Sequence, residues 1–267
     1  MSRGRHRIAY ALRGDPASPP LLMLRGLGRT SRHWGRILHE LERSFRLVLI
    51  DNRGIGRSAV PLLPFSTRTM AVDAIHVLDT LGISSAHVLG ISLGGMIAQE
   101  LALAEPTRVS KLMLGCTRSG GGSGPRMPVA TAVALVAPMR LPAPDAIRET
   151  ARLILSEPFL REHPEVVVEW QSIARELPPK RRGVLFQLLA AARHDTSRRL
   201  ARLTMPTLIV TGDADRLIAP ASSEHLAREI PGAQLQLLRG AGHDFPTEQP
   251  RETAALVRQF CLGEGPN

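Results

Sequence analysis

The sequence has few of the residues that mark several classes of protein. It contains two cysteines in 267 residues, Cys116 and Cys261, so no disulfide framework is expected and a reducing compartment is the default. Aromatic residues make up 3% of the chain, too few to form a stacking platform for nucleic-acid bases. The longest apolar run, residues 129–139, is shorter than the ~20 residues of a transmembrane helix. We therefore expect neither a disulfide scaffold nor a nucleic-acid or membrane partner.

Lysine is also scarce, although the formal net charge is +10. Lys111 and Lys180 are the only lysines, so nearly all of the positive charge comes from arginine. The arginines are scattered, which indicates an arginine-rich composition and not a surface that binds nucleic acid. Residues 1–20 contain four arginines and no sustained apolar stretch, so no secretory signal is visible and a cytoplasmic location is expected.

Strand-like and helix-like segments alternate along most of the chain. The segments with strand character are residues 7–12, 21–24, 45–50, 86–89, 109–114, 207–210 and 234–238. The segments with helical spacing between them are residues 31–43, 69–81, 93–104, 221–230 and 251–260. This alternation predicts an α/β fold, with a mostly parallel twisted sheet covered by helices on both faces.

The alternation stops after the fifth of these strands. Residues 119–128 are a linker rich in glycine, serine and proline, and no convincing strand follows up to residue 203. The helical candidates in this part of the chain are residues 145–155, 165–177 and 183–192. We predict a core made of residues 1–118 and 204–267, with an all-helical cap inserted over residues 119–203.

The strongest local signal is GISLGG at residues 90–95, which follows a predicted strand and opens a predicted helix. A serine in such a tight turn projects its hydroxyl above the sheet edge, and steric crowding requires small neighbours. The helix N-terminus brings N–H groups to the same place. We predict Ser92 as a nucleophile and the Leu93 N–H as an oxyanion donor. Taken alone, a glycine-rich turn around a capping serine is the alternative.

Two later loops carry groups that would activate this serine. Residues 212–216 (GDADR) offer Asp213 and Asp215, and residues 240–245 (GAGHDF) offer His243. Each motif alone is more typical of a turn or of a solvated histidine. Together with the serine they place a nucleophile, a carboxylate and a base at predicted strand ends. Histidine can remove the serine proton near neutral pH, and a carboxylate fixes its tautomer.

With these motifs the chain resembles the α/β-hydrolase superfamily, in its capped, esterase-like branch, along nearly its whole length. Residues 51–58 (DNRGIGRS) are similar to that branch's D-x-R-G-x-G-x-S loop, and residues 206–215 to its P-T-L-I-V-x-G-x-x-D segment. The likeness implies that Asp215, and not Asp213, is the triad acid. Serine at the elbow argues against dehalogenases and epoxide hydrolases of this fold, which carry aspartate there.

The chain departs from this family at two places. The usual oxyanion loop reads H-G-x-G, and here it is Arg25-Gly26-Leu27-Gly28. The likeness implies the Leu27 N–H as second oxyanion donor. Arg25 is expected either to place a cation near the substrate entrance or to pair with a surface carboxylate. We predict substrate contacts at Arg25, Gly26 and Trp34. The N-terminus is short, so the first strand of the usual sheet is expected to be absent or shortened.

Three functions fit these residues, each with a small-molecule partner. The first is hydrolysis of an ester, thioester or lactone of a small, largely apolar substrate through an acyl-enzyme on Ser92. The second is a lyase of a natural-product pathway, in which the His–Asp pair drives loss of a group such as acetate and Arg25 holds it. The third is a non-catalytic ligand binder. No cofactor and no metal site are expected, and neither substrate nor oligomeric state can be read from the sequence.

Overall fold

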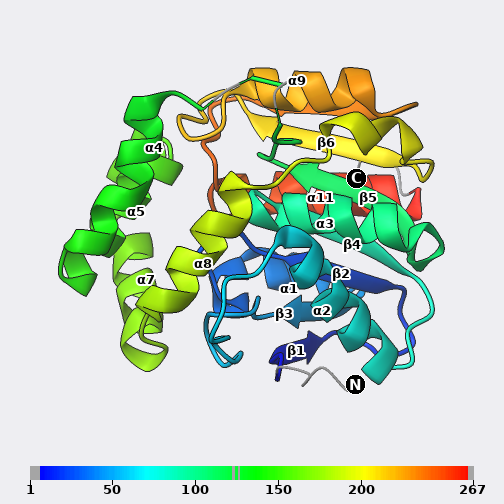
Figure 1. The fold of residues 1–267 in the computed structure, drawn as a ribbon, viewed down its shortest axis with the longest axis horizontal. Helices are drawn as coiled ribbons and strands as arrows, with labels where there is room; N and C mark the ends of the chain where they lie inside the picture. Colours follow the sequence, from blue (N-terminus) through cyan, green and yellow to red (C-terminus); the bar gives the residue numbers. More distant parts are fainter. Residues whose placement is uncertain (1–6, 122–123, 126, 264–267) are drawn as a thin grey trace.

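The computed structural model describes residues 7–121, 124–125 and 127–263. Its centre is a seven-stranded sheet in the order β1-β3-β2-β4-β5-β6-β7 (Figure 1). The strands are β1 (Tyr10–Arg13), β2 (Pro20–Leu24), β3 (Arg46–Ile50), β4 (Ala86–Ile91), β5 (Val109–Gly115), β6 (Thr207–Gly212) and β7 (Gln234–Leu238). Only β1, a four-residue edge strand, is antiparallel to its neighbour. The predicted α/β fold with a mostly parallel sheet is confirmed.

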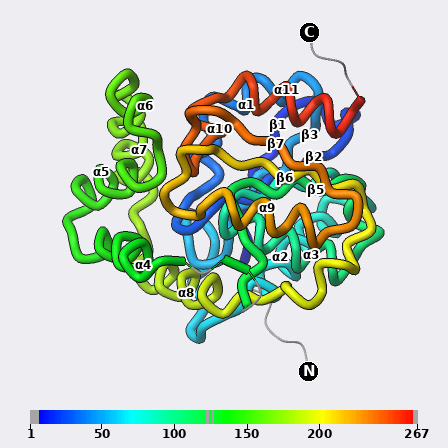
Figure 2. Tube along the Cα trace, turned by 90° about the horizontal axis from the view of Figure 1, so that it is seen from above, coloured from blue at the N-terminus to red at the C-terminus, as the bar shows by residue number. Residues whose placement is uncertain are grey.

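Two apolar layers cover the sheet because successive side chains of a strand point to opposite faces. In β2, Leu22 and Leu24 lie in one layer, and Leu21 and Met23 lie in the other. Figure 2 shows α1 and α11 on one side of the strands and α2 and α3 on the other. The helices of the core are α1 (Ile37–Leu41), α2 (Thr67–Thr80), α3 (Leu93–Ala104), α9 (Pro220–Glu229), α10 (Phe245–Glu248), α11 (Pro250–Leu262), η1 (Ser31–Trp34) and η2 (Pro106–Arg108).

The continuous helix predicted over residues 31–43 is wrong. The chain forms the 3-10 turn η1, then breaks at Gly35 and continues as α1. Gly35 has φ 49° and ψ −124°, a conformation outside the helical region that glycine adopts readily. The turn is closed where the Thr30 N–H donates to His33 Nδ1 at 3.1 Å. The helical spacing of apolar residues therefore continues across residues 31–43, although Gly35 interrupts the helix itself.

Between β5 and β6 the described residues contain helices and no strand of the sheet. These helices are α4 (Val129–Val136), η3 (Ala137–Arg140), α5 (Ala143–Ile154), α6 (Glu157–Glu162), α7 (Glu165–Glu176), α8 (Arg181–Ala192) and η4 (Ser197–Arg202). Figure 1 shows α4, α5 and α7 standing together beside one end of the sheet. We refer to residues 119–203 as the cap. In the part of the chain that the structure describes, no helix is both long and apolar enough to cross a bilayer.

The two ends of the cap meet at one point of the core. Gly120 and Asp195 form an isolated antiparallel bridge, and the Thr196 N–H donates to the Ser119 carbonyl at 2.8 Å. The Thr196 hydroxyl also donates to Gln99 of α3, and both of these side chains are fully buried. A buried polar network therefore joins the entry and the exit of the cap to the core.

Candidate active site

The predicted site residues lie in loops at one edge of the sheet, because parallel strands have their carboxyl ends at the same edge. Ser92 follows β4 directly, Asp215 lies three residues after β6, and His243 lies in the loop after β7. Ser92 and His243 line one cavity together with Arg25, Gly26 and Leu27 of the loop that follows β2. Loops that are distant in the sequence therefore converge on one site.

Ser92 has φ 58° and ψ −121°, a strained conformation that a non-glycine residue keeps only where contacts hold it. Its N–H donates to the Gly115 carbonyl at 2.8 Å, and its carbonyl accepts from the Thr117 hydroxyl at 2.7 Å. Glycine is required at position 90, since a Cβ there would collide with the Gly94 carbonyl oxygen. This is the geometry of a nucleophile elbow, with the serine held between β5 and α3.

His243 Nδ1 lies 2.8 Å from Asp215 Oδ2, and both side chains are buried. The Oδ1 atom of Asp215 accepts the N–H groups of Leu217 at 2.8 Å and Ile218 at 2.9 Å, which fix the carboxylate. An imidazole that donates through Nδ1 keeps Nε2 available as a base. Asp213 is exposed, and its carboxylate accepts a backbone N–H of a neighbouring loop instead. The structure thus pairs the histidine with Asp215.

The predicted oxyanion donors flank this serine. Gly26 packs against it so closely that an added Cβ would lie 3.1 Å from Ser92 Cβ and 3.5 Å from Ser92 Oγ. The Leu27 N–H follows in the same loop, and the Leu93 N–H opens α3. Neither N–H donates a hydrogen bond to any residue that the structure describes. Two unpaired N–H groups beside a nucleophile have the character of an oxyanion hole.

A side chain of the cap supports the oxyanion loop. Gln187 on α8 is fully buried, and its Oε1 accepts the Gly28 N–H at 2.9 Å. Its Nε2 donates to the Arg53 carbonyl at 3.0 Å, in the loop that follows β3. The sequence analysis did not single out this residue, because a glutamine within an apolar helical segment has no distinctive spacing. Gln187 therefore connects the cap to two loops of the core.

Arg25 occupies neither of the two positions that were predicted for it. It is 2% exposed and forms a bidentate ion pair with Asp244, with both N–O distances 2.8 Å. Burial opposes ionisation, but the Arg25 guanidinium holds the pKa of Asp244 below its usual value. Because Asp244 follows His243 directly, the pair joins the oxyanion loop to the histidine loop. A free cation at the entrance and a surface ion pair are both wrong.

Trp34 is fully buried and is absent from the described residues that line the cavity, so the predicted substrate contact is wrong. Its ring lies under the Arg25 guanidinium, 4.7 Å from ring centroid to Cζ.

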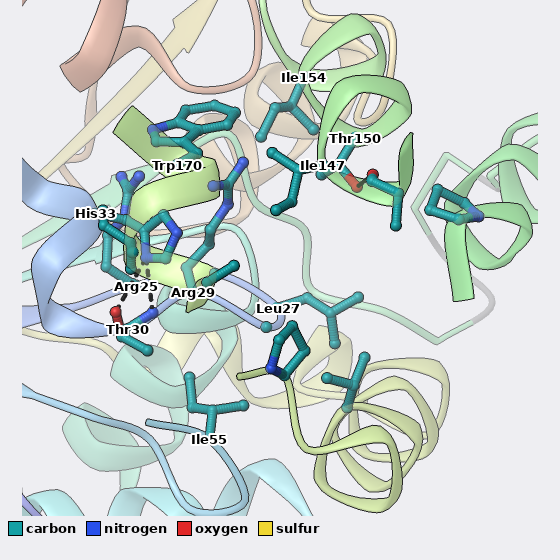
Figure 3. Close-up of a pocket in the computed structure, with 18 of the residues that line it drawn as sticks. Arg25, Leu27, Arg29, Thr30, His33, Ile55, Ile147, Thr150, Ile154 and Trp170 are labelled. Atoms are coloured by element: carbon teal, nitrogen blue, oxygen red, sulfur yellow. Dashed lines mark hydrogen bonds between the residues drawn. The ribbon is translucent and has the colours of Figure 1, made fainter. Parts of the chain in front are cut away.

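The cavity itself has a volume of about 300 Å³. Apolar side chains of the cap, such as Ile147 and Ile154, face it across from Leu27 (Figure 3). Its shape and lining suit a small molecule with apolar parts.

One group of potential metal ligands occurs among the described residues, formed by Cys116, Asp215 and His243. The Cys116 thiol is fully buried behind the histidine–aspartate pair. Burial and the Asp215 charge raise the pKa of this thiol well above its ordinary value, which keeps the sulfur protonated. His243 Nδ1 pairs with Asp215 Oδ2, and Asp215 Oδ1 accepts two backbone N–H groups, so these contacts fit a proton relay with a thiol behind it.

The chain is similar to known proteins along most of its length. The model of the alpha/beta hydrolase family matches residues 21–256. A poly(3-hydroxyalkanoate) depolymerase of Ectopseudomonas oleovorans is 29% identical over 251 residues, which cover 94% of this chain and 87% of that protein. A protein of Pseudomonas savastanoi pv. phaseolicola named "Putative carbamate hydrolase RutD" is 31% identical over 231 residues, which cover 85% and 88%.

Among solved structures, a thermophilic esterase from Thermogutta terrifontis with malate bound aligns with a TM-score of 0.84 and 28% identity. The alignment covers 98% of this chain and 96% of the esterase. The chain therefore belongs to the α/β-hydrolase family, and its relatives identify it as a hydrolase.

Proposed function

We propose that this hydrolase cleaves a carboxylic ester, thioester or lactone through an acyl-enzyme on Ser92. The observation that carries the proposal is the Ser92 elbow in one cavity with His243, whose Nδ1 is held 2.8 Å from Asp215. The N–H groups of Leu27 and Leu93, which donate to no residue that the structure describes, are the proposed oxyanion donors. Such a donor contributes about 3–4 kcal/mol to the stabilisation of an oxyanion.

The reaction takes place in two steps. First, Ser92 Oγ attacks the carbonyl carbon while its proton passes to His243 Nε2. The bond to the leaving group breaks, and the imidazolium returns the proton to the departing oxygen or sulfur. Second, water attacks the acyl-enzyme while one of its protons passes to His243 Nε2. The bond from the acyl carbon to Ser92 Oγ then breaks, the imidazolium returns the proton to Oγ, and the acid is released. Asp215 stabilises the imidazolium in both steps.

Relatives support an acyl transfer of this kind, since a poly(3-hydroxyalkanoate) is a polyester and a carbamate presents a similar carbonyl. The lyase alternative depended on Arg25 as a free cation, and its ion pair with Asp244 removes that support. The binder alternative gives no reason for a histidine that is oriented by a buried carboxylate.

The test is turnover of p-nitrophenyl acetate, butyrate and hexanoate by the wild-type protein and by Ser92→Ala. We expect hydrolysis by the wild type and a loss of kcat of about 10⁴- to 10⁶-fold in the variant. Ser85→Ala is the matched control, because Ser85 lies at the opposite end of β4, against Ser110. In ¹⁸O-water the released acid should carry the label. Full turnover by Ser92→Ala, or an unlabelled acid, would exclude this mechanism.

A further inference from the structure

Arg29 lies in the oxyanion loop, four residues after Arg25, and lines the same cavity as Ser92 and His243. Its guanidinium extends from the core toward the cap and stacks on the ring of Trp170 in α7, 3.6 Å from the ring centroid (Figure 3). Its Nη2 atom is buried and has no hydrogen-bond partner among the described residues. The side chain is therefore positioned by stacking, and its Nη2 donor is not used by any residue that the structure describes.

The charges around Arg29 do not balance. Asp244 is the only carboxylate among the described residues that line the cavity, and Arg25 already binds both of its oxygens. Burial, together with the charges of Arg29 and Arg25, lowers the pKa of His33 well below its ordinary value, so His33 is neutral. Burial also lowers the pKa of Arg29 to about 9, but the guanidinium still carries its proton at neutral pH. Arg25 and Arg29 thus share one anion, while the third lining arginine, Arg181, is exposed to solvent.

A half-buried cation without a counter-ion is costly, because the cavity replaces water with apolar side chains. An anion that enters with the substrate would relieve this cost. The excess is one positive charge, which matches a carboxylate, whereas a phosphate monoester carries up to two negative charges. A stacked guanidinium also presents its N–H groups in a planar fork that fits the two carboxylate oxygens.

We propose that Arg29 is a binding subsite for a substrate carboxylate, so that the preferred ester or lactone carries a free carboxylate a few bonds from the reacting carbonyl. The proposal rests on the proposed function, since Ser92 defines where that carbonyl lies. The remaining lining, with Leu27 from the core and Ile147 and Ile154 from the cap, favours an aliphatic connection between the two groups.

The first test compares each carboxylate-bearing ester with the neutral diester in which that carboxylate is methylated. Monomethyl glutarate and dimethyl glutarate place the carboxylate on the acyl side, and acetoxyacetate and its methyl ester place it on the alcohol side. For at least one pair we expect kcat/KM to be about 10- to 100-fold higher for the carboxylate, the effect of one charge-assisted pair. Arg29→Gln should bring this ratio close to one, and Arg29→Lys should keep part of it.

Arg181→Gln is the matched control, because Arg181 also lines the cavity but is exposed to solvent. Screening by water and salt should limit its effect on the ratio to about two- or threefold. Ratios near one for both pairs in the wild type would overturn the proposal. A ratio that survives Arg29→Gln, or one that Arg181→Gln lowers equally, would also overturn it.

The second test measures binding without turnover. Calorimetric titration of Ser92→Ala should show monomethyl glutarate or acetoxyacetate binding at least about 10-fold more tightly than its neutral partner. The double variant Ser92→Ala, Arg29→Gln should lose this difference. If the wild type hydrolyses no ester but this difference is found, the proposed reaction fails and the subsite stands. If esters are hydrolysed and the difference is absent, the subsite fails and the reaction stands.

Discussion

The loops at the edge of the sheet and the cap that covers them are stabilised in different ways. At the edge, the side chains that carry chemistry are buried and paired, as in His243–Asp215 and Arg25–Asp244. The cap is built around a small apolar cluster that includes Trp170 of α7.

Several of the polar contacts between the cap and the core are exposed, such as Arg32–Glu176 and Arg36–Glu165. Exposed ion pairs of this kind contribute about 0–1 kcal/mol each. The edge is therefore specific in geometry and intolerant of change, whereas the cap surface can vary. We infer that the edge determines the reaction and that the cap, with Arg29 beneath it, selects the substrate.

The contrast between the edge and the cap would be wrong if the edge tolerated the loss of a paired side chain. Asp215→Asn should lower kcat by about 10⁴-fold, because the amide no longer holds the imidazole in the tautomer that a base requires. The measurement is turnover of p-nitrophenyl butyrate. Asp213→Asn is the control and should change kcat by less than about twofold, as expected of an exposed surface position. A larger loss of kcat in Asp213→Asn would show that Asp215 is not the only carboxylate that the reaction needs.

The buried Arg25–Asp244 pair gives the largest expected effect on stability. Arg25→Met leaves the Asp244 carboxylate buried and unpaired, and it should lower the free energy of unfolding by about 3–5 kcal/mol. Urea denaturation measures this loss. The double variant Arg25→Met, Asp244→Leu should recover most of it, because the unpaired carboxylate is then removed as well. A single variant as stable as the wild type, or a double variant as unstable as the single one, would contradict this reading.

The junction of the cap should make stability depend on pH. His194 is buried against Thr67, and burial followed by the charges of Arg118 and Arg199 lowers its pKa to about 3. Between pH 6.5 and pH 3 the unfolded chain binds the proton that the folded chain excludes, so this stabilisation is complete above pH 6.5 and declines as the pH falls.

The loss from pH 7 to pH 4 should amount to about 3 kcal/mol. Chemical denaturation at a series of pH values would measure it, and His194→Gln should flatten the profile by that amount. A profile of His194→Gln parallel to that of the wild type would show that this histidine is not the group involved.

The smallest expected effect concerns Gln187, a buried side chain of the cap that supports the edge. Gln187→Met leaves the Gly28 N–H and the Arg53 carbonyl without their partner, which should cost about 1–3 kcal/mol of stability. It should also lower kcat more than it raises KM, since the oxyanion loop loses a support. Gln187→Glu keeps the acceptor for Gly28 and should retain more of kcat. Equal kcat values for the two variants would show that the hydrogen bond from Gly28 to Gln187 does not support catalysis.

Sequence reasoning worked where local constraints determine structure. The alternation of apolar residues located all seven strands, and the glycines around Ser92 indicated its tight turn. Strand ends of a parallel sheet then predicted that His243 would approach Asp213 or Asp215, and the family resemblance selected Asp215. These signals need no knowledge of which loops touch.

Sequence reasoning failed where a contact joins distant loops. Arg25 and Asp244 are 219 residues apart, and only the folded chain shows that they neutralise each other. The sequence shows Arg25 in place of the usual histidine and Asp244 directly after His243. Nothing in the sequence indicates that these two residues pair. Arg29 was missed for the same reason, since it acts across the boundary between core and cap. Gln187 was missed because its place in an apolar helical segment has no distinctive spacing.

The central claim, that Ser92 is a nucleophile activated by His243, can be measured by fluorophosphonate labelling followed by peptide mass mapping. The account predicts a single adduct on Ser92 in the wild-type protein and almost none in folded His243→Ala. An unlabelled wild-type protein, or an adduct on another serine, would contradict it.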